Sequence, residues 1–450
     1  MPEAAVKTVS TKELKRCLGF WDLMSTSVGQ IIGAGIMSLM GIGIGMTGRS
    51  VVVAFIIAAI FSILSIIPLI ITAGTVRVRG GQYTITALLA GKRFAGVYII
   101  LSIASNITIA MFALSFTEYF LALFMPHGPG KLIAIIVITV FYVINFFGID
   151  KMAKVQNVIV LIMCIALGLL AAFGIGKVSP GFVSKDFFTH GFRGLMTAAA
   201  LLSFATSGAF AIVNLSGEAK NPTRDIPLAA ICSTLLVAVL YGFLAVVAAG
   251  VLPIDQVAYK PLAGVAEAVL PRPVYYFFMV GGAMFALITT LNAQLGWATK
   301  PVLQACVDGW FPQKLAYLHP KYKSPVILLT IFYFFGIIPI IIGFNVGIIG
   351  SLATIVSQIT FVIIAAALFR LPKVVPEEWN KSKFKMPPGA LNIIVVMGAI
   401  GASIPIYFLV TDVSPAILTG NFILVLAGIL YSTWRFNTKK VKFEISYEAN

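Results

Sequence analysis

The chain has 450 residues, of which 59% are hydrophobic and only 11% are charged, and its formal net charge at pH 7 is +16. A soluble domain of this size does not have such a composition, so the sequence predicts an all-α integral membrane protein. The positive charge does not indicate nucleic-acid binding, because it is concentrated in alternate loops between apolar segments.

Apolar segments long enough to cross a bilayer as a helix, about 20 residues each, occur along the whole chain. Twelve transmembrane helices are predicted, at residues 19–46, 51–74, 94–124, 131–149, 153–177, 192–219, 226–252, 273–307, 325–344, 346–371, 389–411 and 416–434. The connections between them are short, so no separate soluble domain is expected. The third, sixth and eighth segments are long enough to tilt or to continue into helices at the membrane surface.

Small residues interrupt the first segment at Gly33-Ala34-Gly35-Ile36 and the sixth at Ala205-Thr206-Ser207-Gly208. A helix that is interrupted inside a membrane leaves backbone N–H and C=O groups unpaired. It persists only where protein, water or a ligand satisfies them. Breaks at matching places in two halves of a chain therefore predict broken helices 1 and 6 around the solute site of a transporter.

The glycines of the first segment have a second interpretation, in which they only allow neighbouring helices to pack closely. We expect this role for Gly41, Gly43 and Gly45, and both interpretations stay open for Gly33 and Gly35. A phosphate-binding loop is not expected, because no strand precedes these glycines.

Lysine and arginine are distributed unevenly between the two sides of the predicted membrane. With the N-terminus inside, the N-terminal segment, alternate loops and the C-terminal tail hold 25 of the 32 Lys and Arg residues. The opposite side holds Arg49, Lys131, Lys177, Lys185, Arg193, Lys260 and Arg272. By the positive-inside rule, this asymmetry predicts a multi-pass protein of the cell membrane with both termini cytoplasmic and an even number of spans.

The two breaks begin two groups of five spans, residues 19–177 and 192–371. A group that follows an odd number of spans has the opposite orientation in the membrane. The sequence therefore predicts a 5+5 inverted repeat with a site near the midplane. Residues 389–434 supply a peripheral pair of helices, and residues 1–18 and 435–450 are the expected cytoplasmic ends.

Several motifs, taken in order, resemble signatures of the amino acid–polyamine–organocation superfamily. They are Ile32-Gly33-Ala34-Gly35-Ile36-Met37, Gly80-Gly81-Gln82-Tyr83, Asn145-Phe146-Phe147-Gly148-Ile149 with Val155-Gln156-Asn157, Glu218-Ala219-Lys220-Asn221-Pro222-Thr223-Arg224-Asp225-Ile226-Pro227, and Thr290-Leu291-Asn292-Ala293 with Lys300, Asp308-Gly309-Trp310-Phe311-Pro312 and His319-Pro320-Lys321. The resemblance covers most of the chain up to residue 325. It implies a leucine-transporter-type fold and transport of amino acids or amines, as a permease or an antiporter.

The two breaks also have complementary polarity. At the first break, glycines let backbone amides approach an anion, and the following half-helix presents its positive end, which suits a carboxylate. At the second break, the carbonyl end of the preceding half-helix suits an ammonium group. The family often has an aromatic residue and an acid where this chain has Thr206 and Phe210. Since no Asp or Glu is expected near the midplane, the site favours a neutral amino acid.

The predicted substrate-binding residues lie at the two breaks and on the spans that face them. They are Gln30, Ile32, Gly33, Ala34, Gly35, Ile36, Ser105, Asn106, Phe204, Ala205, Thr206, Ser207, Gly208, Phe210 and Asn292. The expected partners are a small amino acid-like solute and the lipid bilayer, and the sequence does not define an oligomeric state. No cofactor or metal is expected, because the four cysteines and three histidines lack ligand spacing.

Whether transport is coupled to an ion depends on residues that could bind a proton or a sodium ion. Proton-coupled and sodium-independent relatives often have a lysine where this chain has Met163. Thr289 and Thr290 resemble hydroxyls that bind sodium in related folds, and Lys154 is a further coupling candidate on the cytoplasmic rim. We expect ion-free exchange of solutes. The alternatives are a proton- or sodium-coupled symporter and, in another class, a transporter-fold sensor or an uncoupled channel. An enzyme is not expected, because no catalytic constellation is present.

Overall fold

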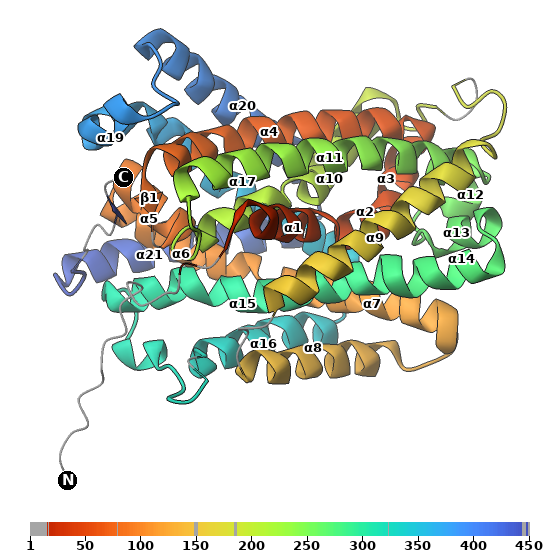
Figure 1. Cartoon of the computed structure of the whole chain (residues 1–450), viewed down its shortest axis with the longest axis horizontal. Helices are drawn as coiled ribbons and strands as arrows, with labels where there is room; N and C mark the ends of the chain where they lie inside the picture. Colours follow the sequence, from red (N-terminus) through yellow and green to blue (C-terminus); the bar gives the residue numbers. More distant parts are fainter. Residues whose placement is uncertain are drawn as a thin grey trace.

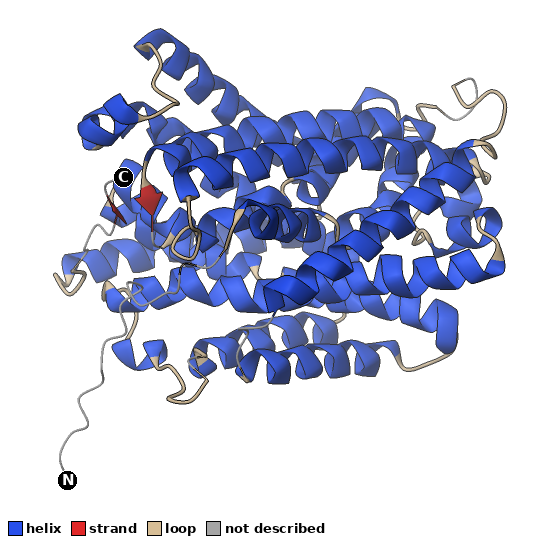
Figure 2. Cartoon of the chain, viewed as in Figure 1, coloured by secondary structure: helices blue, strands red, loops and turns tan. Residues whose placement is uncertain are grey.

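The structure is a computed structural model that describes residues 16, 18–78, 80–147, 152–183, 187–322, 324–442 and 447–448. These residues are mostly helical (Figure 2). The α-helices are α1 (Phe20–Ile31), α2 (Ala34–Met37), α3 (Leu39–Thr47), α4 (Val51–Thr75), α5 (Gly81–Leu89), α6 (Lys92–Ser105), α7 (Thr108–Phe124), α8 (Gly130–Phe146), α9 (Met152–Ile175), α10 (Gly191–Thr206), α11 (Pro222–Gly250), α12 (Ile254–Val257), α13 (Ala263–Val269), α14 (Arg272–Phe277), α15 (Phe285–Val307), α16 (Val326–Ile342), α17 (Val346–Ala367), α18 (Leu371–Val374), α19 (Pro376–Lys381), α20 (Pro388–Asp412) and α21 (Pro415–Asn437).

Shorter elements connect these helices. The 3-10 helices are η2 (Gly48–Ser50), η3 (Gly208–Leu215), η5 (Gln313–Ala316) and η6 (Leu368–Arg370), and η4 (Phe278–Met284) is a π-helix. The strands β1 (Arg77–Val78) and β2 (Tyr447–Glu448) pair antiparallel, with Arg77 opposite Glu448.

Nine helical runs among the described residues are long and apolar enough to cross a membrane. The helices α8 and α16 are also apolar but contain only 17 residues each. The predicted class, an all-α membrane protein, is therefore confirmed. The first predicted span is not among the nine runs, because its helix stops at Ile31 and the run that contains its second half begins at Leu39.

The long helices run along the longest dimension of the molecule, so it has two distinct ends (Figure 1). The strand β1 and helices α5 and α19 lie at the left of this view, which we call the β1 end. The helices α3, α12 and α13 lie toward the right, which we call the α12 end.

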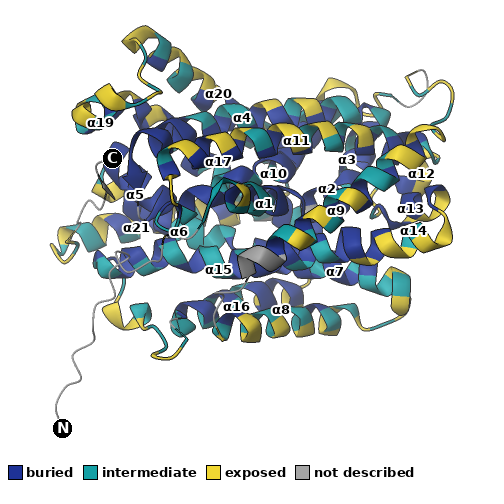
Figure 3. Ribbon diagram, viewed as in Figure 1, coloured by how far each residue is buried: buried dark blue, intermediate teal, exposed yellow. Residues whose placement is uncertain are grey.

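The helices that contain the two predicted breaks lie at the centre of the molecule (Figure 3). In the run formed by α10 and η3, 83% of the most apolar 18-residue stretch is buried inside the molecule, whereas the figure for the corresponding stretch of α21 is 17%. The helix α1 packs against α9, α11, α15 and η3. Both breaks are thus enclosed by other helices, whereas α21 and α20 expose much apolar surface, as expected for helices that face lipid.

Both predicted breaks are present as local interruptions of the helices. Residues Ile32 and Gly33 separate α1 from α2, and Ser207 separates α10 from η3. The third predicted span is also interrupted, which the sequence analysis did not predict. There Asn106 ends α6, and its Nδ2 donates to the carbonyl oxygen of Ser102 at 2.7 Å. This bond competes with the helical backbone pattern and explains the turn between α6 and α7.

Candidate functional site

The two breaks lie against each other. A Cβ atom added to Gly35 would lie 2.4 Å from the Cβ of Ala205, and one added to Gly208 would lie 2.6 Å from the carbonyl oxygen of Gln30. These separations are far below a van der Waals contact. Both glycines are therefore required for the close approach of the two broken helices, which gives them a packing role at the predicted site.

The other glycines of the first segment also serve packing. A Cβ on Gly41 would lie 1.8 Å from the carbonyl oxygen of Lys260, and one on Gly45 would lie 2.4 Å from the ring of Tyr259. The packing role expected for these two glycines is confirmed. Gly43 is less crowded, since its nearest neighbour would be a Leu202 methyl group at 3.0 Å.

Protein groups satisfy the carbonyl oxygens at the end of α1. The hydroxyl of Tyr241 donates to the Ile31 oxygen at 2.9 Å, and the Thr290 hydroxyl lies 2.8 Å from the Gly29 oxygen. The amide N–H groups of Gly33 and Gly35 donate to no acceptor in the described part of the chain. The first break thus retains free donors but few free acceptors, as a carboxylate site requires.

The second break differs, because neighbouring side chains use its polar groups. The Thr206 hydroxyl lies 2.6 Å from that of Ser62 on α4 and 3.2 Å from the Ala58 carbonyl oxygen. Ser62 also donates to the Ser203 oxygen at 3.0 Å. The Thr206 side chain therefore faces α4.

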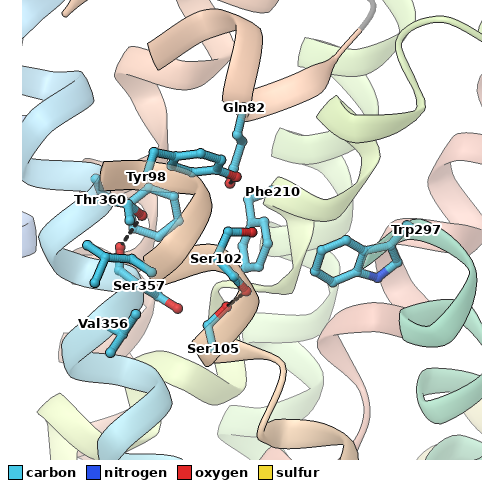
Figure 4. A pocket seen from close by; sticks show the side chains of 11 residues that line it. Gln82, Tyr98, Ser102, Ser105, Phe210, Trp297, Val356, Ser357 and Thr360 are labelled. Atoms are coloured by element: carbon cyan, nitrogen blue, oxygen red, sulfur yellow. Dashed lines mark hydrogen bonds between the residues drawn. The ribbon is translucent and has the colours of Figure 1, made fainter. Parts of the chain in front are cut away.

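A small cavity lies between α5, α6, η3, α15 and α17 (Figure 4). Among the predicted site residues it is lined by Ser105 and Phe210. Its wall also contains Gln82, Tyr98, Ser102 and Trp297, which the sequence analysis did not select. Residues of α17 close its remaining side.

The indole of Trp297 connects this cavity to the first break. Its Nε1 donates to Oε1 of Gln30 at 3.1 Å, and Gln30 is in the last turn of α1. The Phe210 ring meets Trp297 edge to face, with ring centroids 6.0 Å apart. Predicted residues from α1, α6 and η3 therefore come together around a tryptophan from α15.

Several other predicted residues lie near the breaks but have structural partners. The Asn106 Oδ1 accepts from Nε2 of Gln294 at 3.1 Å, and Asn292 Oδ1 accepts from Nδ2 of Asn145 at 2.7 Å. The side chains of Ile32 and Ile36 are fully buried in the apolar core. These four side chains are thus engaged with other helices in this structure.

The remaining predicted residues belong to the helix ends at the breaks. Phe204 is partly buried, Ala205 packs under Gly35, and the Ser207 hydroxyl donates to the Phe204 oxygen at 3.3 Å. Ala34 is in α2, and its side chain lies outside the described part of the structure.

The coupling candidates are separated by the fold. Thr290 contacts the α1 break, whereas the Thr289 hydroxyl donates to Ala286 within its own helix at 2.9 Å. Lys154 is in α9, and its side chain lies outside the described part of the structure. Met163 is fully buried. Near the break, the carboxylate of Glu118 accepts from the Ser38 hydroxyl at 3.0 Å, so an acid lies beside the turn between α2 and α3.

One sequence signal could have identified two of the missed residues, Tyr98 and Ser102. Tyr98, Ser102 and Ser105 are spaced at i, i+4 and i+7, which places them on one face of a helix. Such a polar stripe in an apolar segment indicates a buried cavity or a polar partner. Trp297 follows Thr290 by two helical turns on α15, and only its contact with Gln30 distinguishes it from an ordinary core tryptophan.

Comparison with known proteins gives a consistent family. Residues 18–433 match the model of a family described as amino acid permease. The branched-chain amino acid permease BcaP of Bacillus subtilis is 28% identical over 396 residues, which is 82% of this chain and 84% of the permease. The methylthioribose transporter of Bacillus subtilis is 26% identical over 422 residues, which is 89% of each chain. Cationic amino acid transporter 1 of Arabidopsis thaliana is 25% identical over 347 residues, which is 71% of this chain and 57% of that transporter.

Proposed function

Because this chain belongs to the amino acid permease family, we propose that it carries neutral amino acids across the cell membrane by alternating access. The family establishes a multi-pass membrane transporter, not an enzyme. The observation that supports transport of an amino acid is the direct contact of the two breaks. There Gly35 packs on Ala205, and the Gly33 and Gly35 amides have no acceptor among the residues that the structure describes. Free backbone donors in an enclosed site suit the carboxylate of an amino acid.

The proposed architecture has twelve spans, with residues 19–177 and 192–371 as inverted five-helix repeats and residues 389–434 as a peripheral pair. Nine long apolar runs in the described part of the chain, the shorter helices α8 and α16, and the broken first helix support this number. Both five-helix groups begin with an interrupted helix, which supports the repeat. The β1 end includes Arg77, Lys220 and Arg435, which supports cytoplasmic termini at that end.

We propose a neutral substrate because, among the residues that the structure describes, those that line the cavity beside the breaks are all uncharged. A cationic or anionic side chain in such a place would lack a counter-ion, which is unfavourable in a membrane interior. Among the relatives, one is named for branched-chain amino acids and one for methylthioribose. Both solutes therefore belong in a binding screen, alongside polar neutral amino acids and arginine.

The proposed mode is exchange without a coupling ion, supported by the buried Met163 at the place where coupled relatives often have a lysine. Proton-coupled symport is a second candidate, supported by Glu118. Its carboxylate accepts from Ser38 next to the break. Within the described residues, no Lys, Arg or His forms an ion pair with it.

The two modes are separated in proteoliposomes of purified protein. Exchange requires unlabelled solute inside and no ion gradient, whereas symport into empty liposomes requires a proton or sodium gradient. If an imposed proton gradient drives uptake and Glu118→Gln removes that uptake, symport is correct. Ligand-dependent thermal stabilisation without any flux would instead indicate a sensor, and flux without saturation would indicate a channel.

A further inference from the structure

The cavity beside the two breaks extends from Trp297 toward the β1 end. Trp297 lies two helical turns, about 10 Å, beyond Thr290 along α15. The same helix ends where Asp308 accepts from the hydroxyl of Tyr83 at 2.7 Å, and Tyr83 is on α5, directly after β1. Gln82, the neighbour of Tyr83, forms the part of the cavity wall that is supplied by α5 (Figure 4).

Gln82 is buried and has one polar atom without a partner. Its side chain is 4% exposed. Its backbone N–H donates to Oδ1 of Asn214 at 3.1 Å, and its Oε1 accepts from the hydroxyl of Tyr98 at 2.9 Å. The Nε2 group donates to no acceptor in the described part of the chain. A buried donor without an acceptor is unfavourable, so this atom requires a partner that the described residues do not supply.

The chemistry of the cavity wall indicates which partner would fit. Hydroxyl groups of Ser102, Ser105, Ser357 and Thr360 line it together with aromatic rings, and none of its lining residues is charged. In this conformation the cavity has room for little more than about one water molecule. That space accepts the polar end of a neutral side chain but not a second whole solute.

We propose that Gln82 is a specificity-determining residue whose Nε2 donates to a hydroxyl or carboxamide oxygen on the side chain of the transported solute. This inference rests on the proposed transport of neutral amino acids and narrows it to serine, threonine, asparagine and glutamine over valine and leucine. An aliphatic side chain would leave Nε2 of Gln82 unpaired. Sites built to form a hydrogen bond discriminate strongly against analogues that lack it.

The test is competition in counterflow with purified full-length protein in proteoliposomes. Labelled serine enters vesicles loaded with serine, and unlabelled asparagine, glutamine, threonine, valine or leucine competes outside. We expect the polar competitors to inhibit at lower concentrations than valine and leucine. We define the selectivity ratio as the inhibitory potency of the polar competitors divided by that of valine and leucine. In Gln82→Leu, which keeps the side-chain volume but removes the donor, this ratio should fall about tenfold.

A matched control is Gln358→Leu. Gln358 is another buried glutamine, but its Nε2 lies 3.4 Å from the Ser203 hydroxyl and it does not line the cavity. Its replacement should leave the selectivity ratio unchanged. If Gln82→Leu does not fold, Tyr98→Phe supplies the test, because it removes the hydroxyl that holds the Gln82 amide. The ratio should then fall in the same direction.

Two results would contradict this inference about Gln82 and leave the proposed transport function intact. They are an unchanged ratio in folded Gln82→Leu or Tyr98→Phe, and a wild-type protein that exchanges neutral amino acids but prefers valine and leucine. If the wild-type protein exchanges no neutral amino acid, the proposed function fails and this inference fails with it.

Discussion

At the scale of single residues, the glycines at the breaks explain how two interrupted helices can touch. Gly35 leaves no room for a methyl group above Ala205, and Gly208 leaves none above Gln30. The neighbours on both sides are backbone or Cβ atoms, which cannot move away as a flexible side chain can. Substitutions at these positions must therefore separate the breaks.

Gly35→Ala should abolish transport and lower stability, by about 1–3 kcal/mol as is typical of overpacking. The added methyl would overlap with Ala205 and push α2 away from α10. Uptake in proteoliposomes and a thermal unfolding curve measure the two effects. The control is Gly242→Ala on α11, where an added Cβ meets nothing within 4 Å. Normal transport by Gly35→Ala would contradict the close contact of the breaks.

The ion pair between Lys300 and Glu218 joins α15 to the segment after η3. Their side chains are 28% and 21% exposed, so solvent screens the pair only in part. Lys300→Met and Glu218→Gln should each reduce stability, and a double-mutant cycle should give a coupling energy of about 1 kcal/mol. Additive effects of the two substitutions, measured by thermal unfolding, would show that the pair contributes nothing.

At the scale of elements, most helices here begin without a side-chain cap, and α17 is an exception. The Oδ1 of Asn345 accepts from the backbone N–H of Ile348 at 2.8 Å. Elsewhere polar side chains interrupt helices, as Asn106 does between α6 and α7. The same residue type therefore starts one helix and ends another, according to where its side chain finds a partner.

Asn345→Ala should destabilise the protein by about 1 kcal/mol, the usual value of a lost N-cap. The measurement is the shift of the thermal unfolding midpoint. Asn345→Asp retains the acceptor oxygen and should behave like the wild-type protein. Equal loss in both variants would mean that the cap does not stabilise α17.

The short sheet provides a second prediction at this scale. Truncation after Lys442 removes β2 and leaves the Lys442 N–H, which donates to the Asp308 oxygen at 3.0 Å. Hydrogen exchange at β1 should become faster, because its backbone groups lose their partners, while exchange near Asp308 should stay slow. Unchanged exchange at β1 would show that the pairing with β2 does not protect it.

At the scale of the whole molecule, the enclosed breaks require a conformational change for any solute to enter or leave. A solute can shift the balance between two states only through its different affinity for them. If the protein changes conformation in either direction only with a solute bound, each solute that enters is matched by one that leaves, which is exchange.

Vesicles loaded with unlabelled neutral amino acid should therefore accumulate labelled amino acid without a proton or sodium gradient, and empty vesicles should accumulate little. The physical reason is that the protein without solute returns slowly to the conformation that is open to the outside, because no solute bridges the two breaks. Counterflow with radiolabelled solute measures the effect. Uptake into empty vesicles that follows an imposed ion gradient would reverse this prediction and favour Glu118, Thr290 or Lys154 as coupling residues.

The sequence by itself determined the membrane class, the positions of the two breaks and the family, because long apolar runs, glycine interruptions and ordered motifs are local features. It also led to Ser105 and Phe210, which line the cavity. Only the tertiary structure decided that Thr206 faces α4, that Asn292 pairs with Asn145, and that Trp297 reaches Gln30. These outcomes depend on which helices become neighbours and how each is rotated, and neither property is encoded in the local pattern of a uniformly apolar helix.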